Sequence, residues 1–330
     1  MRKSSAAILI GSLLIAGAAL ASEAPALPDL TTFALMRSNP ATFLTVEQTA
    51  DALKDSDVIF LGEWHDHSGN HLAEMELFRA LYQRAPQLAL SMEQFERDVQ
   101  PVVDDYMDGK IGEEALLGRG RAWSNYAESY RPLVEYAKDH HLPVIAANAP
   151  ASVVRCVGEQ GPEFLSHLDA EKRRWAAAEL HLADGAYKDK FMRFLAEDGT
   201  HGGARTPQSD SRAYAAQVVR DDTMAESIFL YVQKNPGHKV VHITGAFHAE
   251  AGLGTVERLR ARAPNLKIAV VVPAEAENPG NPRVTDADRK QGDFLFVLRG
   301  LPKDYVNDAE KKAAEKEQMA NFRTRSQCRL

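Results

Sequence analysis

Short apolar runs alternate along this chain with longer segments in which apolar residues recur at helical spacing. Such runs are typical of strands buried on both faces, and apolar positions three and four residues apart line one face of a helix. The predicted strands are residues 58–61, 88–92, 143–147, 239–243, 267–272 and 294–298. The predicted helices are residues 71–83, 99–107, 127–140, 206–233 and 253–262, with further helix between 151 and 204 around a Gly-rich break at 199–203. The alternation predicts an α/β fold of three layers, α/β/α, with a mainly parallel central sheet.

The first residues of the chain do not follow this pattern. Residues 6–20 are almost wholly apolar, follow two basic residues, and end in the small-x-small triplet Ala19-Leu20-Ala21. This combination predicts a cleavable signal peptide over residues 1–21, with an uncleaved membrane anchor as the alternative. No Cys stands at the expected cleavage point to carry a lipid. We therefore expect a periplasmic or secreted protein.

The C-terminal part of the chain also departs from the apolar pattern. After Pro302 the sequence becomes polar and charged, which favours a surface tail over a further part of the core. Because α/β domains of this size often form a single unit, we expect one domain over residues 22–305 and a charged tail over residues 306–330.

Charge and cysteine content narrow the classes of partner and cofactor. The formal net charge of −7 becomes −9 without Arg2 and Lys3, and an acidic domain repels the phosphate backbone, so we expect no nucleic-acid partner. Only Cys156 and Cys328 are present, which excludes covalent c-type haem and argues against a zinc–thiolate site. An oxidising compartment permits a disulfide between them, and two free thiols are the alternative.

Polar residues stand where the predicted strands end. The first strand ends at Gly62-Glu63-Trp64-His65, the second at Glu93, the third at Asn148, and the fourth at Gly245-Ala246-Phe247-His248. In an open parallel sheet, ligands bind outside the carboxyl ends of the strands. The two Gly-x-x-His segments have the same form, since Gly allows a sharp turn off a strand. These residues are therefore predicted to share one site.

Imidazole and carboxylate together support several kinds of chemistry. A His can act as general base, metal ligand or haem ligand, and a carboxylate can orient it or complete a metal shell. The candidate catalytic residues are Glu63, His65, Glu93 and His248, and the candidate metal ligands are Glu63, His65 and His248. His71 is a further candidate that can face the site from the first turn of the following helix. A buried structural network is the alternative for all of them.

Two other segments have both a structural and a functional interpretation. Trp123, Tyr126, Tyr130 and Tyr136 form an aromatic stretch that either packs in the core or walls a flat ligand, with a Tyr as axial iron ligand. The run Arg220-Asp221-Asp222 provides either an ion pair within its helix or a contact to the site.

Seven segments match one known family, in order, from about residue 46 to about residue 259. They are Leu61–Asp66, Met92–Phe95 with Gln100, Tyr106–Gly109, Tyr130–Leu133, Ala147–Pro150, Gln217–Ala225 and Gly245–His248. With these segments the chain resembles the ChaN-like haem-binding uptake proteins of the TIKI and erythromycin-esterase superfamily. The resemblance implies the three-layer α/β/α fold that the apolar pattern also predicts.

The resemblance also implies a ligand and a set of site residues. It implies binding of haem or iron at the cell envelope, with Tyr130 as the candidate haem-ligating Tyr. Asn148 at a strand end and His71 in the first helical turn are the other candidate cofactor contacts. It further implies a homodimer that holds two haems face to face and an envelope transport system as partner. In esterase and peptidase relatives, the positions of His65, Glu93 and His248 are the catalytic set.

Three functions are consistent with this sequence. The first is a periplasmic haem- or iron-binding protein for uptake or storage. The second is a hydrolase, an esterase or peptidase in which His65 activates water or a divalent metal lowers the pKa of bound water. The third is a binding or scaffold protein that uses the cluster only structurally.

Overall fold

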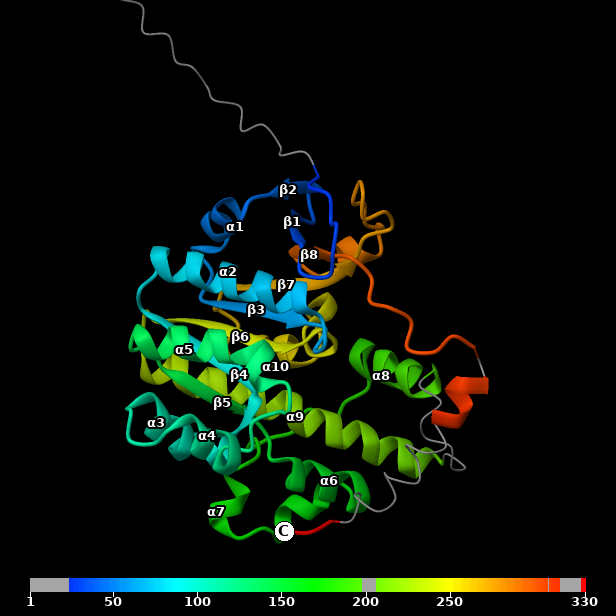
Figure 1. The fold of residues 1–330 in the computed structure, drawn as a ribbon. Coiled ribbons are helices and arrows are strands. Elements are labelled where there is room, and N and C mark those ends of the chain that lie inside the picture. The colour runs from blue at the N-terminus through cyan, green and yellow to red at the C-terminus, as the bar shows by residue number, and fades with distance from the viewer. Residues whose placement is uncertain (1–23, 198–205, 308, 315–327) are drawn as a thin grey trace, which may run out of the picture.

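One eight-stranded sheet forms the centre of the computed structural model, which describes residues 24–197, 206–307, 309–314 and 328–330 (Figure 1). The strands are β1 (Phe33–Arg37), β2 (Thr42–Leu44), β3 (Val58–Glu63), β4 (Leu88–Glu96), β5 (Val144–Asn148), β6 (Lys239–Gly245), β7 (Ile268–Glu275) and β8 (Phe294–Leu298). Their order in the sheet is β2-β1-β8-β7-β3-β6-β4-β5. All neighbours from β8 to β5 are parallel, so the mainly parallel sheet is confirmed.

Strands β1 and β2 were not anticipated from the sequence. β1 pairs antiparallel with both β2 and β8. The two strands therefore extend the parallel part of the sheet beyond β8. β2 is only three residues long and half-buried, so it lacks the apolar run that marks the inner strands. Short edge strands give little periodic signal, which explains the omission.

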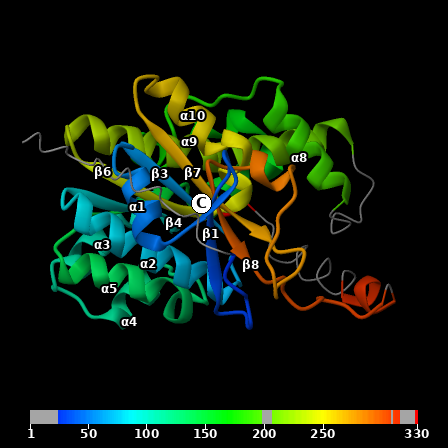
Figure 2. The same ribbon diagram turned by 90° about the horizontal axis from the view of Figure 1, so that it is seen from above.

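Helices cover both faces of the sheet and complete the three layers (Figure 2). One layer contains α1 (Val46–Leu53), α2 (Ser68–Arg84), α3 (Gln100–Met107), α4 (Glu113–Arg119) and α5 (Arg131–Asp139). The other contains α9 (Pro207–Lys234) and α10 (Thr255–Arg262), and α6 (Ala151–Gln160), α7 (Ala170–Arg173) and α8 (Ala186–Glu197) belong to the same side. The predicted α/β/α architecture is therefore confirmed.

Alternation of side chains along the inner strands divides the core into two halves. Ile59 and Leu61 of β3 pack with Leu77 of α2, whereas Phe60 packs with Met224 of α9 on the opposite face. Successive residues of a strand point to opposite faces of the sheet. The same alternation decides which polar side chains at the strand ends can meet.

A disulfide joins Cys156 of α6 to Cys328, so the two thiols are paired in this structure rather than free. The predicted signal peptide over residues 1–21 and the Gly-rich break at 199–203 lie outside the described residues. Among the helices that the structure describes, none is both long and apolar enough to span a membrane.

Candidate functional site

Three neighbouring strands place the predicted site residues at one edge of the sheet. β6 lies between β3 and β4, and Glu63 at the end of β3 is in register with Gly245 at the end of β6. Glu93 follows the last residues of β4 that pair with β6. The short helix Ala246–His248 continues directly from β6. The structure therefore brings Glu63, His65, Glu93 and His248 to the carboxyl edge, as their positions after the strands predicted.

Glu63 is the centre of a first group of side chains, called here the Glu63 network and consisting of Glu63, His65, Asn70, His71, Glu74, Gln94 and Tyr130. Its Oε1 accepts hydrogen bonds from Tyr130 Oη at 2.7 Å and from Gln94 Nε2 at 2.9 Å. The same oxygen lies 2.6 Å from His65 Nδ1. Three donors thus fix the Glu63 carboxylate and the orientation of the His65 ring.

His71 connects Glu63 to a second buried carboxylate. Its Nε2 lies 2.9 Å from the backbone oxygen of His65, and its Nδ1 lies 3.1 Å from Glu74 Oε2 and 3.5 Å from Glu63 Oε2. Burial disfavours the charged imidazolium, but the two carboxylates outweigh burial and raise the pKa of His71 to about 9. Burial, together with the charge of Glu63, raises the pKa of Glu74 well above its usual range.

Glu93 is the centre of a second group on the opposite face, called here the Glu93 network and consisting of Glu93, Asp221, Thr244, His248, Tyr187 and Thr255. Glu93 Oε2 accepts hydrogen bonds from Thr244 Oγ1 at 2.7 Å and from the backbone N–H of Gly245 at 2.8 Å. His248 Nε2 lies 3.4 Å from Glu93 Oε1. Burial raises the pKa of the Glu93 carboxyl, but His248 outweighs it and holds that pKa well below its usual range.

Asp221 of α9 completes the surroundings of His248. Its Oδ1 lies 2.8 Å from His248 Nδ1 and accepts a hydrogen bond from Thr255 Oγ1 at 2.9 Å, while Oδ2 accepts one from Tyr187 Oη at 2.6 Å. Burial opposes a charge on His248, yet Glu93 and Asp221 raise its pKa to about 10. His248 is thus an imidazolium held between two carboxylates. Asp221 therefore contacts the site through His248. This is the second of the two interpretations of the Arg220-Asp221-Asp222 run, a contact to the site.

The ring of His65 lies between the two networks. Its side chain is 41% exposed, and Trp123 packs edge-on against it with ring centroids 5.0 Å apart. A Cβ at Gly245 would lie 2.8 Å from His65 Nε2, so any side chain there would have to displace the His65 ring. Nδ1 is engaged by Glu63, and among the described residues Nε2 has no hydrogen-bond partner.

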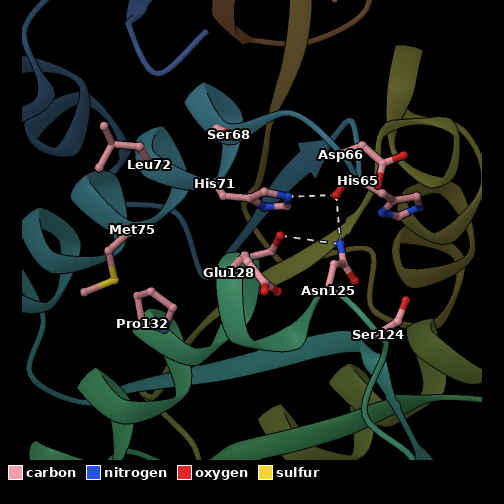
Figure 3. Close-up of a pocket in the computed structure, with 11 residues that line it drawn as sticks. His65, Asp66, Ser68, His71, Leu72, Met75, Ser124, Asn125, Glu128 and Pro132 are labelled. Atoms are coloured by element: carbon pink, nitrogen blue, oxygen red, sulfur yellow. Dashed lines mark hydrogen bonds between the residues drawn. The ribbon is translucent and has the colours of Figure 1, made fainter. Parts of the chain in front are cut away.

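A cavity of about 490 Å³ opens beside the Glu63 network (Figure 3). Its apolar wall is formed by Leu72, Met75 and Pro132, and its polar wall includes His71 and Asn125. Both polar side chains bind the backbone oxygen of His65, at 2.9 and 3.0 Å. In Figure 3 the ring of His71 lies inside the cavity wall, whereas the ring of His65 lies on the side away from Leu72 and Met75.

Two predicted cofactor contacts, Tyr130 and Asn148, need correction or refinement. The Tyr130 side chain is fully buried, and its hydroxyl is bound to Glu63, so it is not presented to a haem as an axial ligand. Burial and the charge of Glu63 also raise its pKa, which disfavours the phenolate. Asn148 donates to the backbone oxygen of Glu93 at 3.1 Å and thereby shapes the end of β4 instead of facing a cofactor.

The structure also changes the metal-ligand set. In the described part of the chain, the group whose ligand atoms lie within 4.8 Å of one another is Glu63, His71 and Glu74. The predicted set of Glu63, His65 and His248 is not brought together in this way, because His65 Nδ1 faces Glu63 while His248 lies in the other network. Only Glu63 is common to both sets.

Glu74 and Gln94 are two of the network residues that were not among the sequence candidates. Glu74 stands three residues after His71 and is fully buried, although charged residues on a helix usually mark its solvent face. Gln94 directly follows Glu93 and points to the opposite face of the sheet, where it meets Glu63. The available signal was the i, i+3 spacing of His71 and Glu74, which places both on one helical face.

Comparison with protein families gives a clear match for this chain. The family described as "Haem-binding uptake, Tiki superfamily, ChaN" matches residues 49–259, which include both networks. The chain belongs to this family. The family match confirms the resemblance that the seven sequence segments indicated.

Individual relatives of this ChaN family protein are distant. The chloroplastic protein RETICULATA-RELATED 5 of Arabidopsis thaliana is 28% identical over 215 residues, which cover 61% of this chain and 28% of that protein. The chain thus spans less than a third of the length of this curated relative.

The structure of ChaN from Campylobacter jejuni with cofacial haem has a TM-score of 0.61 and 15% identity, covering 81% of this chain and 97% of that chain. An erythromycin esterase variant in its open conformation has a TM-score of 0.44 and 13% identity, covering 86% of this chain and 87% of that chain. The ChaN structure supports the fold.

Proposed function

We propose that this ChaN family protein is a periplasmic haem-binding protein that serves haem or iron uptake. Family membership supports haem as the ligand class, and the predicted signal peptide supports the compartment. The observation that carries the proposal is the state of His65: a half-exposed imidazole whose Nδ1 is fixed by Glu63 and whose Nε2 has no partner in the described chain. An envelope transport system and a homodimer belong to the same proposal as partners.

The donor set at His65 fits an axial haem ligand. Histidines that bind a metal through one ring nitrogen usually donate the other N–H to a carboxylate or a carbonyl, which fixes the ring and raises its basicity. Glu63 provides this carboxylate. Aromatic side chains lie near His65 and His248. Trp123 packs against His65, and Phe247, which directly precedes His248, contacts Phe194 with ring centroids 5.3 Å apart. When bound, the haem would supply an iron centre that His65 ligates.

A haemin titration tests this proposal. Wild-type protein should shift the Soret band at stoichiometric haemin, and His65→Ala should remove the shift. Tyr130→Phe should retain it, because the Tyr130 hydroxyl is bound inside the protein. His167→Ala is the matched control, since His167 is exposed and lies outside both networks. No Soret shift with wild-type protein, or an unchanged shift with His65→Ala, contradicts the proposal.

A hydrolase is the second candidate function, and the Glu93 network favours it. His248 is held as a cation beside Glu93, a position from which an imidazolium can stabilise a developing negative charge. His65, oriented by Glu63, would then be the residue that activates water. A panel of ester and peptide substrates tests this alternative. Turnover that is lost in both His65→Ala and His248→Gln supports it, and turnover that survives His65→Ala contradicts it.

A further inference from the structure

We propose that Glu63, His71 and Glu74 form a binding site for a divalent transition-metal ion, separate from the His65 ring. Each of the three side chains offers one ligand atom, and these atoms all lie within 4.8 Å of one another. The ring nitrogen His71 Nδ1 faces the carboxylate oxygens Glu63 Oε2 and Glu74 Oε2. The site does not rest on haem binding, because none of its ligand atoms belongs to His65.

The hydrogen-bond pattern leaves these three atoms turned toward one another. Glu63 Oε1 is occupied by its three donors, and Glu74 Oε1 accepts from Asn70 Nδ2 at 3.1 Å. Glu63 Oε2, in contrast, is buried and has no hydrogen-bond partner in the described structure. An unpartnered buried carboxylate oxygen is costly unless a cation or a donor compensates it.

The ring of His71 is oriented as a metal ligand would be. Its Nε2 lies 2.9 Å from the backbone oxygen of His65, an acceptor that requires the hydrogen to be on Nε2. In the neutral tautomer the lone pair is then on Nδ1, which faces the two carboxylates. A backbone carbonyl that holds the second ring nitrogen is a common outer partner of a metal-binding His.

The spacing of the ligand atoms suits a small cation. Metal–nitrogen and metal–oxygen bonds of about 2.0–2.1 Å place tetrahedral ligands about 3.3–3.4 Å apart. His71 Nδ1 lies 3.1 Å from Glu74 Oε2 and 3.5 Å from Glu63 Oε2, on either side of this value. Two carboxylates and one imidazole also balance a charge of +2 and suit Zn²⁺, Fe²⁺ or Mn²⁺ by ligand type.

The cavity beside α2 gives this site an entry path. His71 forms part of the wall of the 490 Å³ cavity, whereas the Glu63 and Glu74 side chains are fully buried behind it. An ion that enters from the cavity would meet His71 first and keep one position for water, the usual arrangement of a three-ligand site. Protons on His71 Nδ1 and on the Glu74 carboxyl compete with the ion, and metal binding would release them.

Metal binding by the full chain tests the proposal directly. Protein purified without haem and stripped with a chelator would be titrated separately with Zn²⁺, Fe²⁺ under anaerobic conditions, and Mn²⁺, followed by dialysis and elemental analysis. We expect one ion per chain for at least one of the three. Failure of all three ions to bind wild-type protein at one per chain overturns the site, whatever the haemin titration gives.

Variants assign the ion to these residues. Glu74→Gln keeps the shape of the side chain and an oxygen for Asn70, and its amide can donate to His71 Nδ1, so the fold should persist while metal affinity falls more than about 100-fold. Glu76→Gln, at a half-exposed position of the same helix, is the matched control and should bind as wild type. His71→Ala is the second ligand variant, and circular dichroism reports its folding. Wild-type affinity in either Glu74→Gln or His71→Ala overturns the assignment.

Discussion

The Glu63 and Glu93 networks lie at the same sheet edge but differ in how completely their polar atoms are paired. In the Glu93 network, Asp221 accepts from two hydroxyl groups, and His248 contacts a carboxylate through each ring nitrogen. In the Glu63 network, Glu63 Oε2 has no hydrogen-bond partner among the described residues, and the His65 ring is 41% exposed. The Glu93 network thus holds a fixed charge on His248, whereas the Glu63 network leaves polar atoms available to a ligand.

This contrast has a simple energetic meaning. A buried charge network that is fully paired loses much when one member is removed, because the remaining charge has no compensation. A network with unpartnered atoms already carries that cost and recovers it when a ligand binds. We therefore expect stability to depend mainly on the Glu93 network and ligand binding mainly on the Glu63 network.

The largest expected effect is the loss of Asp221. Asp221→Ala leaves His248, Tyr187 and Thr255 without their buried acceptor, and should lower the free energy of unfolding by about 3–5 kcal/mol in urea denaturation. Asp184→Ala is the control, since its carboxylate is 88% exposed and pairs with Lys188, and it should cost about 0.5 kcal/mol or less. A loss with Asp221→Ala as small as that of the control would contradict the comparison.

The second effect concerns the pH dependence of stability. Folding raises the pKa of His248 from 6.5 to about 10, so its stabilising contribution is complete below pH 6.5, shrinks as pH rises, and is lost above about pH 10. Between pH 6.5 and 9 this contribution should decrease by about 3 kcal/mol. His71 and other groups also titrate in this range.

Comparison of wild type with His248→Gln isolates the contribution of His248. Urea denaturation of both proteins at pH 6.5, 7.5 and 9 should give a difference in free energy of unfolding that narrows toward pH 9. Parallel profiles would mean that His248 does not carry a fixed charge, and the two networks would then not differ as described.

The smallest effect on stability is expected at Gly245, between the networks. The Cβ of Gly245→Ala would meet the end of the His65 ring, which can move, so we expect a cost below about 1 kcal/mol. Haemin affinity should nevertheless fall about tenfold or more, because His65 is displaced from its bond with Glu63. Gly118→Ala, where nothing lies within 4 Å of the added Cβ, is the control. Unchanged haemin affinity in Gly245→Ala would mean that haemin binding does not depend on the position of the His65 ring.

Much of the site follows from the sequence because its residues directly follow buried strands. Glu63, Glu93 and the helix that begins after Gly245 come to one edge once three strands are parallel and adjacent. Apolar runs and Gly-x-x-His segments are local signals, so they can be read without knowing the strand order. The same reasoning gave the six inner strands, but not β1 and β2, which gain their places by pairing at the sheet edge.

The residues that contact the site from helices were harder to predict from the sequence. Glu74 and Asp221 are charged residues in amphipathic helices, where a charge normally marks the solvent side. Tyr130 was expected to face a haem, and its burial depends on how the π-helix Tyr126–Tyr130 directs its hydroxyl to Glu63. The spacing of His71 and Glu74 places both on one helical face, but no local pattern at these positions shows whether that face is buried.

The sequence by itself determined the parallel α/β architecture, the edge at which the chemistry gathers, and the histidines and carboxylates that follow the strands. The tertiary structure decided how those groups are paired. Gln94 and Glu93 are consecutive, yet one joins Glu63 and the other joins His248, because side chains of a strand alternate between faces that different helices cover. Pairing energies depend on distances between segments far apart in the chain, and only the packed layers fix those distances.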